Sequence, residues 1–99
     1  MVPEFRGVMA APNQSEIKAK VLGKKQSPDF EDKLLLDLEI LDSKSISGPN
    51  FAHIGENVKG FTFELKPEIL AGKIITARAE FVGDERGGKF RLKQIRLLE

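Results

Sequence analysis

The sequence of 99 residues contains no cysteine, no tryptophan and no tyrosine, and it has a single histidine. Without cysteine, a disulfide framework, a thiolate nucleophile and a cysteine-ligated zinc site are excluded. One histidine gives poor support to a histidine-rich metal site or a Ser-His-Asp triad. We therefore expect a protein that is not an enzyme and that uses no cofactor and no metal.

Long apolar runs are also missing. The longest uninterrupted aliphatic run is Leu34-Leu35-Leu36, whereas a membrane-spanning helix needs about 20 predominantly apolar residues. Glu4 and Arg6 precede a very short apolar stretch over residues 8–11, which does not match the apolar core of a secretory signal. We expect a soluble, cytoplasmic protein with no membrane partner.

The length predicts one domain, because a chain this short does not divide into two cores of ordinary size. Alternation of apolar and polar residues starts near Ser15, so residues 1–14 are interpreted as an N-terminal extension and residues 15–99 as the domain. The alternation predicts strands over residues 15–25, 33–42, 58–65, 73–82 and 89–98.

The last of these strands changes phase partway along its length. Phe90 and Leu92 share one parity, whereas Ile95 and Leu97 share the other. A β-bulge near Lys93-Gln94 would keep all four side chains inside. We therefore predict a bulge at that position.

The connections between the strands carry turn and helix signals. Residues 26–32 combine a proline with three acidic residues and predict a chain reversal. Pro67 suits a first helical position and Gly72 a C-terminal stop, so one or two helical turns are expected over residues 67–71. Residues 83–88 are glycine-rich and predict a hairpin loop.

The connection over residues 43–57 is long and has no sustained period. Loops of this length are usually functional or mobile. Ile46, Phe51 and Ile54 make it partly apolar, so it is expected either to fold back and plug the core or to form a patch for a partner.

The predicted core is the set of large apolar side chains on one face of each strand. At about 1.5 to 3 kcal/mol for each fully buried large apolar side chain, a dozen such residues supply a core suited to this size. The expected members are Ile17, Val21, Leu34, Leu36, Leu38, Ile40, Phe61, Phe63, Ile75, Phe81, Phe90 and Leu92.

The order of two strands, a long connection, a strand, a short helix and two strands resembles the OB-fold, a five-stranded Greek-key barrel. The segment KPEILAGKIITARAEFVGDERGGKFRLKQIRLLE is similar to the last half of small archaeal and bacterial single-strand-binding and replication-protein-A-like domains. The fold class is therefore expected to be all-β, with one short helix between the third and fourth strands. Another small barrel, such as an SH3-like one, is the alternative, and the expected helix weakens it.

Charge is unevenly distributed, although sixteen basic and fifteen acidic residues almost cancel. Residues 73–96 contain seven basic residues against three acidic, whereas residues 29–42 contain six acidic against one basic. The resemblance implies a ligand face on the second and third strands, flanked by the loops after the first and fourth strands.

We expect the basic loops and the fourth and fifth strands to bind single-stranded nucleic acid, with lysine and arginine on the phosphates and a phenylalanine ring for stacking. The candidate binding residues are Lys24, Lys25, Phe30, Arg78, Arg86, Lys89, Arg91 and Lys93.

Several residues oppose this interpretation. Asp37 and Glu39 are predicted on the outer face of the second strand, and Thr62 and Glu64 replace stacking rings on the outer face of the third. The alternative function is a protein-interaction or assembly domain that uses the apolar 43–57 loop and the acidic second strand. Scattered lysine and arginine side chains would then serve only to keep the domain in solution.

Overall fold

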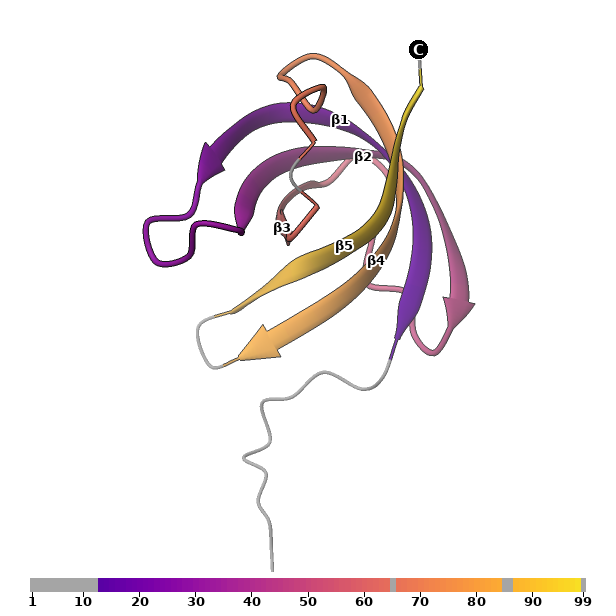
Figure 1. Ribbon diagram of the computed structural model, residues 1–99. Helices are drawn as coiled ribbons and strands as arrows, with labels where there is room; N and C mark the ends of the chain where they lie inside the picture. Colours follow the sequence, from indigo (N-terminus) through magenta and orange to yellow (C-terminus); the bar gives the residue numbers. More distant parts are fainter. Residues whose placement is uncertain (1–12, 65, 85–86, 99) are drawn as a thin grey trace, which may run out of the picture.

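A computed structural model describes residues 13–64, 66–84 and 87–98 (Figure 1). The described chain forms the strands β1 (Gln14–Gln26), β2 (Leu34–Ser47), β3 (Asn57–Thr62), β4 (Ile74–Asp84) and β5 (Gly87–Leu98).

The strands close into a barrel in the order β1-β2-β3-β5-β4. Neighbouring strands are antiparallel except for β3 and β5, which run parallel. The prediction of an all-β, five-stranded barrel is confirmed, and this barrel is compatible with an OB-like fold. The strand order does not by itself confirm the expected Greek-key arrangement.

The prediction of a short helix over residues 67–71 is wrong, because the described part of the chain contains no helix. The segment forms two successive turns instead. The amide of Ile69 donates to the carbonyl of Lys66 at 3.1 Å, and the amide of Lys73 donates to the carbonyl of Leu70 at 3.0 Å. Proline and glycine suit such turns as well as they suit the two ends of a helix.

Pairing with β1 explains why turns replace the helix. The amide of Gly72 donates to the carbonyl of Val21 at 2.7 Å, and the amide of Val21 donates to the carbonyl of Lys73 at 2.8 Å. Gly72 has φ 92°, a left-handed conformation that glycine adopts without strain. The chain therefore joins β1 before a helical hydrogen-bond ladder is established, and Ile69 is left fully buried.

The core lies inside the barrel and consists of aliphatic side chains with one phenylalanine. The predicted core is confirmed for its residues on β1, β2, β4 and β5, apart from Phe81, which is half-buried and packs against the core. The buried apolar residues are Ile17, Ala19, Val21, Leu34, Leu36, Leu38, Ile40, Ala52, Ile69, Ile75, Ala77, Ala79, Phe90, Leu92 and Ile95.

The two faces of β3 are the reverse of those predicted. Thr62 is fully buried, whereas Phe63 is 51% exposed and Phe61 is half-buried on the outer surface. A Cβ atom at Gly60 would lie 3.2 Å from Leu38 Cδ1, so the core leaves little space for a side chain here. The small residues of β3 therefore face inward, because side chains from the neighbouring strands already fill the barrel.

The predicted bulge in β5 is confirmed. Thr76 pairs with Arg96 and Arg78 pairs with Lys93, so two residues of β5 lie opposite one residue of β4. Gln94 has φ 54° and takes up the extra length. The bulge keeps the side chains on both sides of the phase change directed toward the barrel interior.

The carboxylate of Glu64 holds the two amides that this bulge frees. Glu64 Oε2 accepts from the amide of Gln94 at 2.7 Å, and Oε1 accepts from the amide of Ile95 at 3.0 Å. Glu64, which was predicted to replace a stacking ring on the outer face of the third strand, therefore joins the chain after β3 to β5.

Replacing Glu64 by glutamine is expected to lower the free energy of unfolding by about 1.5–3 kcal/mol, the usual contribution of hydrogen bonds to a charged group. Glutamine keeps one acceptor oxygen, so one amide of the bulge loses its partner. Urea denaturation followed by circular dichroism measures the change, with Glu68→Gln at an exposed position as the matched control. Equal stability of the two variants would contradict this role.

Candidate functional site

One row of residues crosses the outer surface of the barrel over all five strands. Lys25 pairs with Leu35, Leu35 with Phe61, Phe61 with Arg91, and Arg91 with Glu80. Paired residues on neighbouring strands point to the same face of a sheet. Basic and apolar side chains from distant parts of the sequence therefore share one surface.

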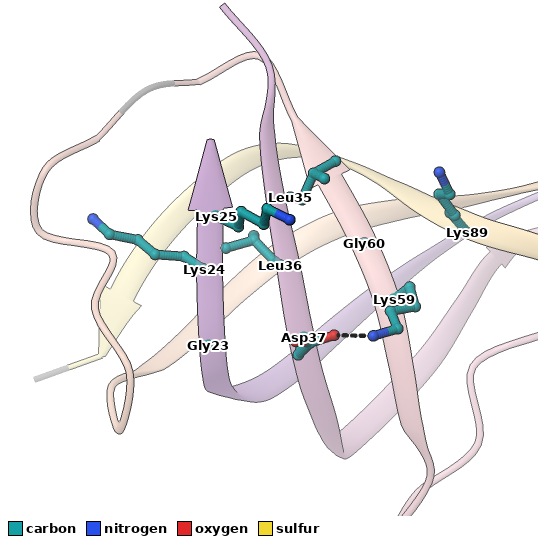
Figure 2. A pocket seen from close by; sticks show the side chains of 9 residues that line it. All are labelled: Gly23, Lys24, Lys25, Leu35, Leu36, Asp37, Lys59, Gly60 and Lys89. Atoms are coloured by element: carbon teal, nitrogen blue, oxygen red, sulfur yellow. Dashed lines mark hydrogen bonds and ion pairs between the residues drawn. The ribbon is translucent and has the colours of Figure 1, made fainter. Parts of the chain in front are cut away.

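A groove of about 580 Å³ lies beside this row, over β1, β2 and β3 (Figure 2). We call it the lysine groove, because four of its side chains are lysines and, among the residues that the structure describes, Asp37 is the only carboxylate that lines it. Its lining residues are Gly23, Lys24, Lys25, Leu35, Leu36, Asp37, Lys59, Gly60 and Lys89. The groove therefore carries a formal net charge of about three positive units, which favours a polyanion.

The carboxylate in the groove is paired. Asp37 Oδ1 lies 2.7 Å from Lys59 Nζ across β2 and β3, and both side chains remain largely exposed (Figure 2). An exposed pair of this kind contributes little to stability, but it offsets the negative charge that Asp37 would present to a phosphate. The acidity of the second strand thus opposes an anionic ligand less than the sequence suggests.

Three phenylalanine rings cluster on the outer surface and extend the site from the groove. Phe30 is 54% exposed in the β1–β2 loop, and Phe63 is 51% exposed just after β3. The centroids of Phe61 and Phe63 are 6.0 Å apart in an edge-to-face arrangement. Lys33 Nζ lies 4.6 Å from the Phe61 centroid and 5.4 Å from the Phe30 centroid. We call Phe30, Phe61 and Phe63 the aromatic cluster.

The loop that carries Phe30 is held by one side chain. Gln26 Nε2 lies 3.0 Å from the carbonyl oxygen of Phe30, 2.6 Å from that of Glu31 and 3.2 Å from that of Lys33. A second contact runs from the amide of Asp29 to the hydroxyl of Ser27 at 3.2 Å. These bonds fix the backbone of the loop from which the Phe30 ring projects.

Four of the predicted site residues lie in or beside this surface. Lys24, Lys25 and Lys89 line the lysine groove, and Phe30 belongs to the aromatic cluster. The prediction missed Lys59, which β3 brings beside β2. It also missed the exposure of the β3 phenylalanines, for which the small inward residues at positions 60 and 62 are the only sequence signal.

The other predicted residues do not line the lysine groove. Arg91 lies beside Phe61 in the row described above, and its Nη2 lies 2.5 Å from Glu80 Oε1. Arg78 pairs with Lys93 across β4 and β5 and lines a separate hollow with Glu16. Arg86 lies outside the described residues. The structure thus separates Arg78 and Lys93 from the lysine groove.

The connection between β2 and β3 is shorter than predicted, because β2 continues to Ser47. Phe51 stacks on Phe81 with a centroid distance of 4.9 Å, and Ala52 is buried, so this part plugs the barrel. Ile54 is 67% exposed, and Ile46 at the end of β2 is also exposed. Phe51 and Ala52 therefore fold back onto the core, as one of the two expectations has it, whereas the patch for a partner stays a prediction.

The residues that the structure describes contain neither a group of metal-ligating side chains nor a membrane-spanning helix. No three histidine, cysteine, aspartate or glutamate side chains among them gather into a metal site. No helix there is long and apolar enough to cross a membrane.

Comparison with models of known protein families gives no match, and searches of curated proteins and of solved structures find no significant relative. The function therefore has to be argued from the surface itself.

Proposed function

We propose that this chain is a non-catalytic OB-fold module that binds single-stranded nucleic acid on the outer surface of β1, β2 and β3. The observation that carries the proposal is the continuity of the lysine groove with the aromatic cluster, since Leu35 of the groove pairs directly with Phe61 of the cluster. Proteins that bind single strands combine a basic groove for the backbone with rings for the bases.

The lysine groove binds the phosphates in this proposal. Lys24 and Lys25 approach from β1, Lys59 from β3 and Lys89 from β5. Lysine ammonium groups on flexible stems neutralise phosphates without demanding a fixed geometry. Binding should therefore depend on charge and strand flexibility more than on base sequence.

The aromatic cluster receives the bases. Exposed rings cannot reach the bases inside a duplex, whereas the unstacked bases of a single strand lie against them without prior unpairing. The edge-to-face arrangement of Phe61 and Phe63 leaves ring faces in different orientations. Single-stranded DNA or RNA is thus preferred over the corresponding duplex.

Fluorescence anisotropy with a labelled single-stranded oligonucleotide tests the proposal. We expect binding whose log affinity falls with log salt concentration, at about −0.7 per phosphate neutralised. Four lysines set a limit of about −3 on that slope. Absence of binding at low salt, or binding that salt does not change, would contradict the proposal, and unlabelled duplex at equal phosphate concentration is the matched competitor.

A protein-interaction role is the second candidate, favoured by the exposure of Ile46 and Ile54 around the β2–β3 connection. A cytoplasmic location stays a prediction.

A further inference from the structure

A second hollow, of about 330 Å³, opens between the starts of β3 and β5. We call it the β3–β5 cleft. The rings of Phe51, Phe81 and Phe90 line it together with Val58 and Gly88, and its polar residues are Glu56, Asn57 and Lys59. It is therefore an aromatic cavity with polar groups beside it.

The cleft exists because β3 and β5 pair over a short distance. Their parallel ladder consists of Gly60 with Phe90 and Phe61 with Arg91. Residues 57–59 and 88–89 precede these pairs, and they pair instead with β2 and β4 on their other sides. The β3–β5 ladder thus leaves residues 57–59 and 88–89 unjoined to each other, and the cleft opens between them.

The aromatic wall is closely packed. Phe51 stacks on Phe81 with an interplanar angle of 25°, and Phe81 meets Phe90 with a centroid distance of 5.2 Å. A Cβ atom at Gly88 would lie 2.2 Å from Cζ of Phe81, so the ring fills the space that a side chain at position 88 would need. Glycine at this position lets the wall form.

We propose that the β3–β5 cleft binds one nucleobase of the strand whose phosphates lie in the lysine groove. This inference rests on the proposed function. Lys59 lines both hollows, and Gly88 of the cleft is followed directly by Lys89 of the groove, so the two sites are contiguous. One strand can therefore extend from one hollow into the other.

A base fits the chemistry of the cleft better than an aliphatic side chain does. It is flat and aromatic, so it packs against rings, and its edges hydrogen-bond to backbone amides and carbonyls. An aliphatic side chain would leave the polar groups beside the cleft unpaired and desolvated. The Lys59 ammonium also matches the phosphate that accompanies a base and has no counterpart in an apolar peptide.

The absence of tryptophan and tyrosine makes a clean optical test possible. In the Phe51→Trp variant the indole is the only strong fluorophore, and it lies in the cleft wall. We expect a single-stranded oligonucleotide to quench this fluorescence, and an abasic strand of the same length to bind with much less quenching. Leu98→Trp is the matched control, because Leu98 is exposed at the opposite end of β5 and its fluorescence should stay unchanged.

Anisotropy of the same labelled strand separates the two levels of the proposal. Binding with base-dependent quenching supports the cleft. Binding in which the two strands quench equally, or not at all, overturns the cleft and leaves the proposed function standing. No binding at low salt overturns both.

A second measurement uses the unaltered protein, in case the indole disturbs the packing. The sequence has seven phenylalanines, few enough for their ring protons to be followed by NMR. A bound base should shift the ring resonances of Phe51 and Phe81, and the abasic strand should not. Shifts confined to Phe30, Phe61 and Phe63 would place the bases on the aromatic cluster alone and contradict the cleft.

Discussion

Replacing Lys24, Lys25, Lys59 and Lys89 together by glutamine is expected to lower the affinity for a single-stranded oligonucleotide by roughly 10²-fold or more at about 0.1 M salt. Each lysine that neutralises a phosphate contributes about 0.7 to the slope of log affinity against log salt concentration. The same variant should therefore lose most of the salt dependence of the parent. Anisotropy titrations at three salt concentrations measure both quantities.

The control for this variant changes the same amount of charge elsewhere. Lys18, Lys20, Lys44 and Lys73 are exposed and do not line the lysine groove. Replacing these four by glutamine should weaken binding only slightly, because exposed charges farther away than about 10 Å are screened at 0.1 M salt. Equal losses in the two variants would show that total charge, and not the groove, drives binding.

Replacing Gly88 by alanine is expected to lower the free energy of unfolding by about 1–3 kcal/mol, the usual cost of overpacking. The added methyl group would collide with the Phe81 ring, which contacts the rings of Phe51 and Phe90 and would have to shift against them. In a domain of this length each kcal/mol lowers the melting temperature by about 4–8 °C. Thermal denaturation followed by circular dichroism gives the result.

Two comparisons assign that effect to the collision. At Gly23 a Cβ atom would meet nothing closer than 3.7 Å, so Gly23→Ala should leave the melting temperature nearly unchanged. Adding Phe81→Leu to Gly88→Ala should cost less than the sum of the two single changes, because a smaller side chain makes room for the methyl group. Strict additivity would contradict a direct contact between positions 81 and 88.

The sequence predicts the strands and the bulge because both follow from the alternation of apolar and polar side chains. A change of parity between Leu92 and Ile95 has one economical solution, an extra residue in the strand. Lys24, Lys25 and Lys89 could also be chosen, since they lie next to loops that meet at one side of a closed sheet. Local pattern and general topology were sufficient for these features.

Which side chains of β3 point into the barrel could not be predicted from alternation. A period of two separates Phe61 and Phe63 from Gly60 and Thr62, but it does not say which pair is inside. Placing the larger apolar side chains inside is the usual choice. In this barrel the side chains of β2 and β5 leave little volume beside β3, so the smaller residues face inward instead.

The turns over residues 66–73 also could not be predicted from the local sequence, because a distant hydrogen-bond partner selects them. Proline, an acid and glycine in this order are compatible with a short helix or with two turns. The partner that selects the turns is Val21, about fifty positions earlier in the sequence. Lys59 was missed for a related reason, because its neighbourhood is created by the pairing of β3 with β2.

The ladder between β3 and β5 is short, so the barrel closes between these two strands through few residue pairs. Two residue pairs and the Glu64 carboxylate join the strands there, whereas β1 and β2 pair over most of their lengths. A phosphate held between Lys59 and Lys89 would link β3 to β5, because one lysine comes from each of these strands. A ligand that binds the closed barrel stabilises it by mass action, so the weakest join in the fold is also where a bound strand would reinforce it.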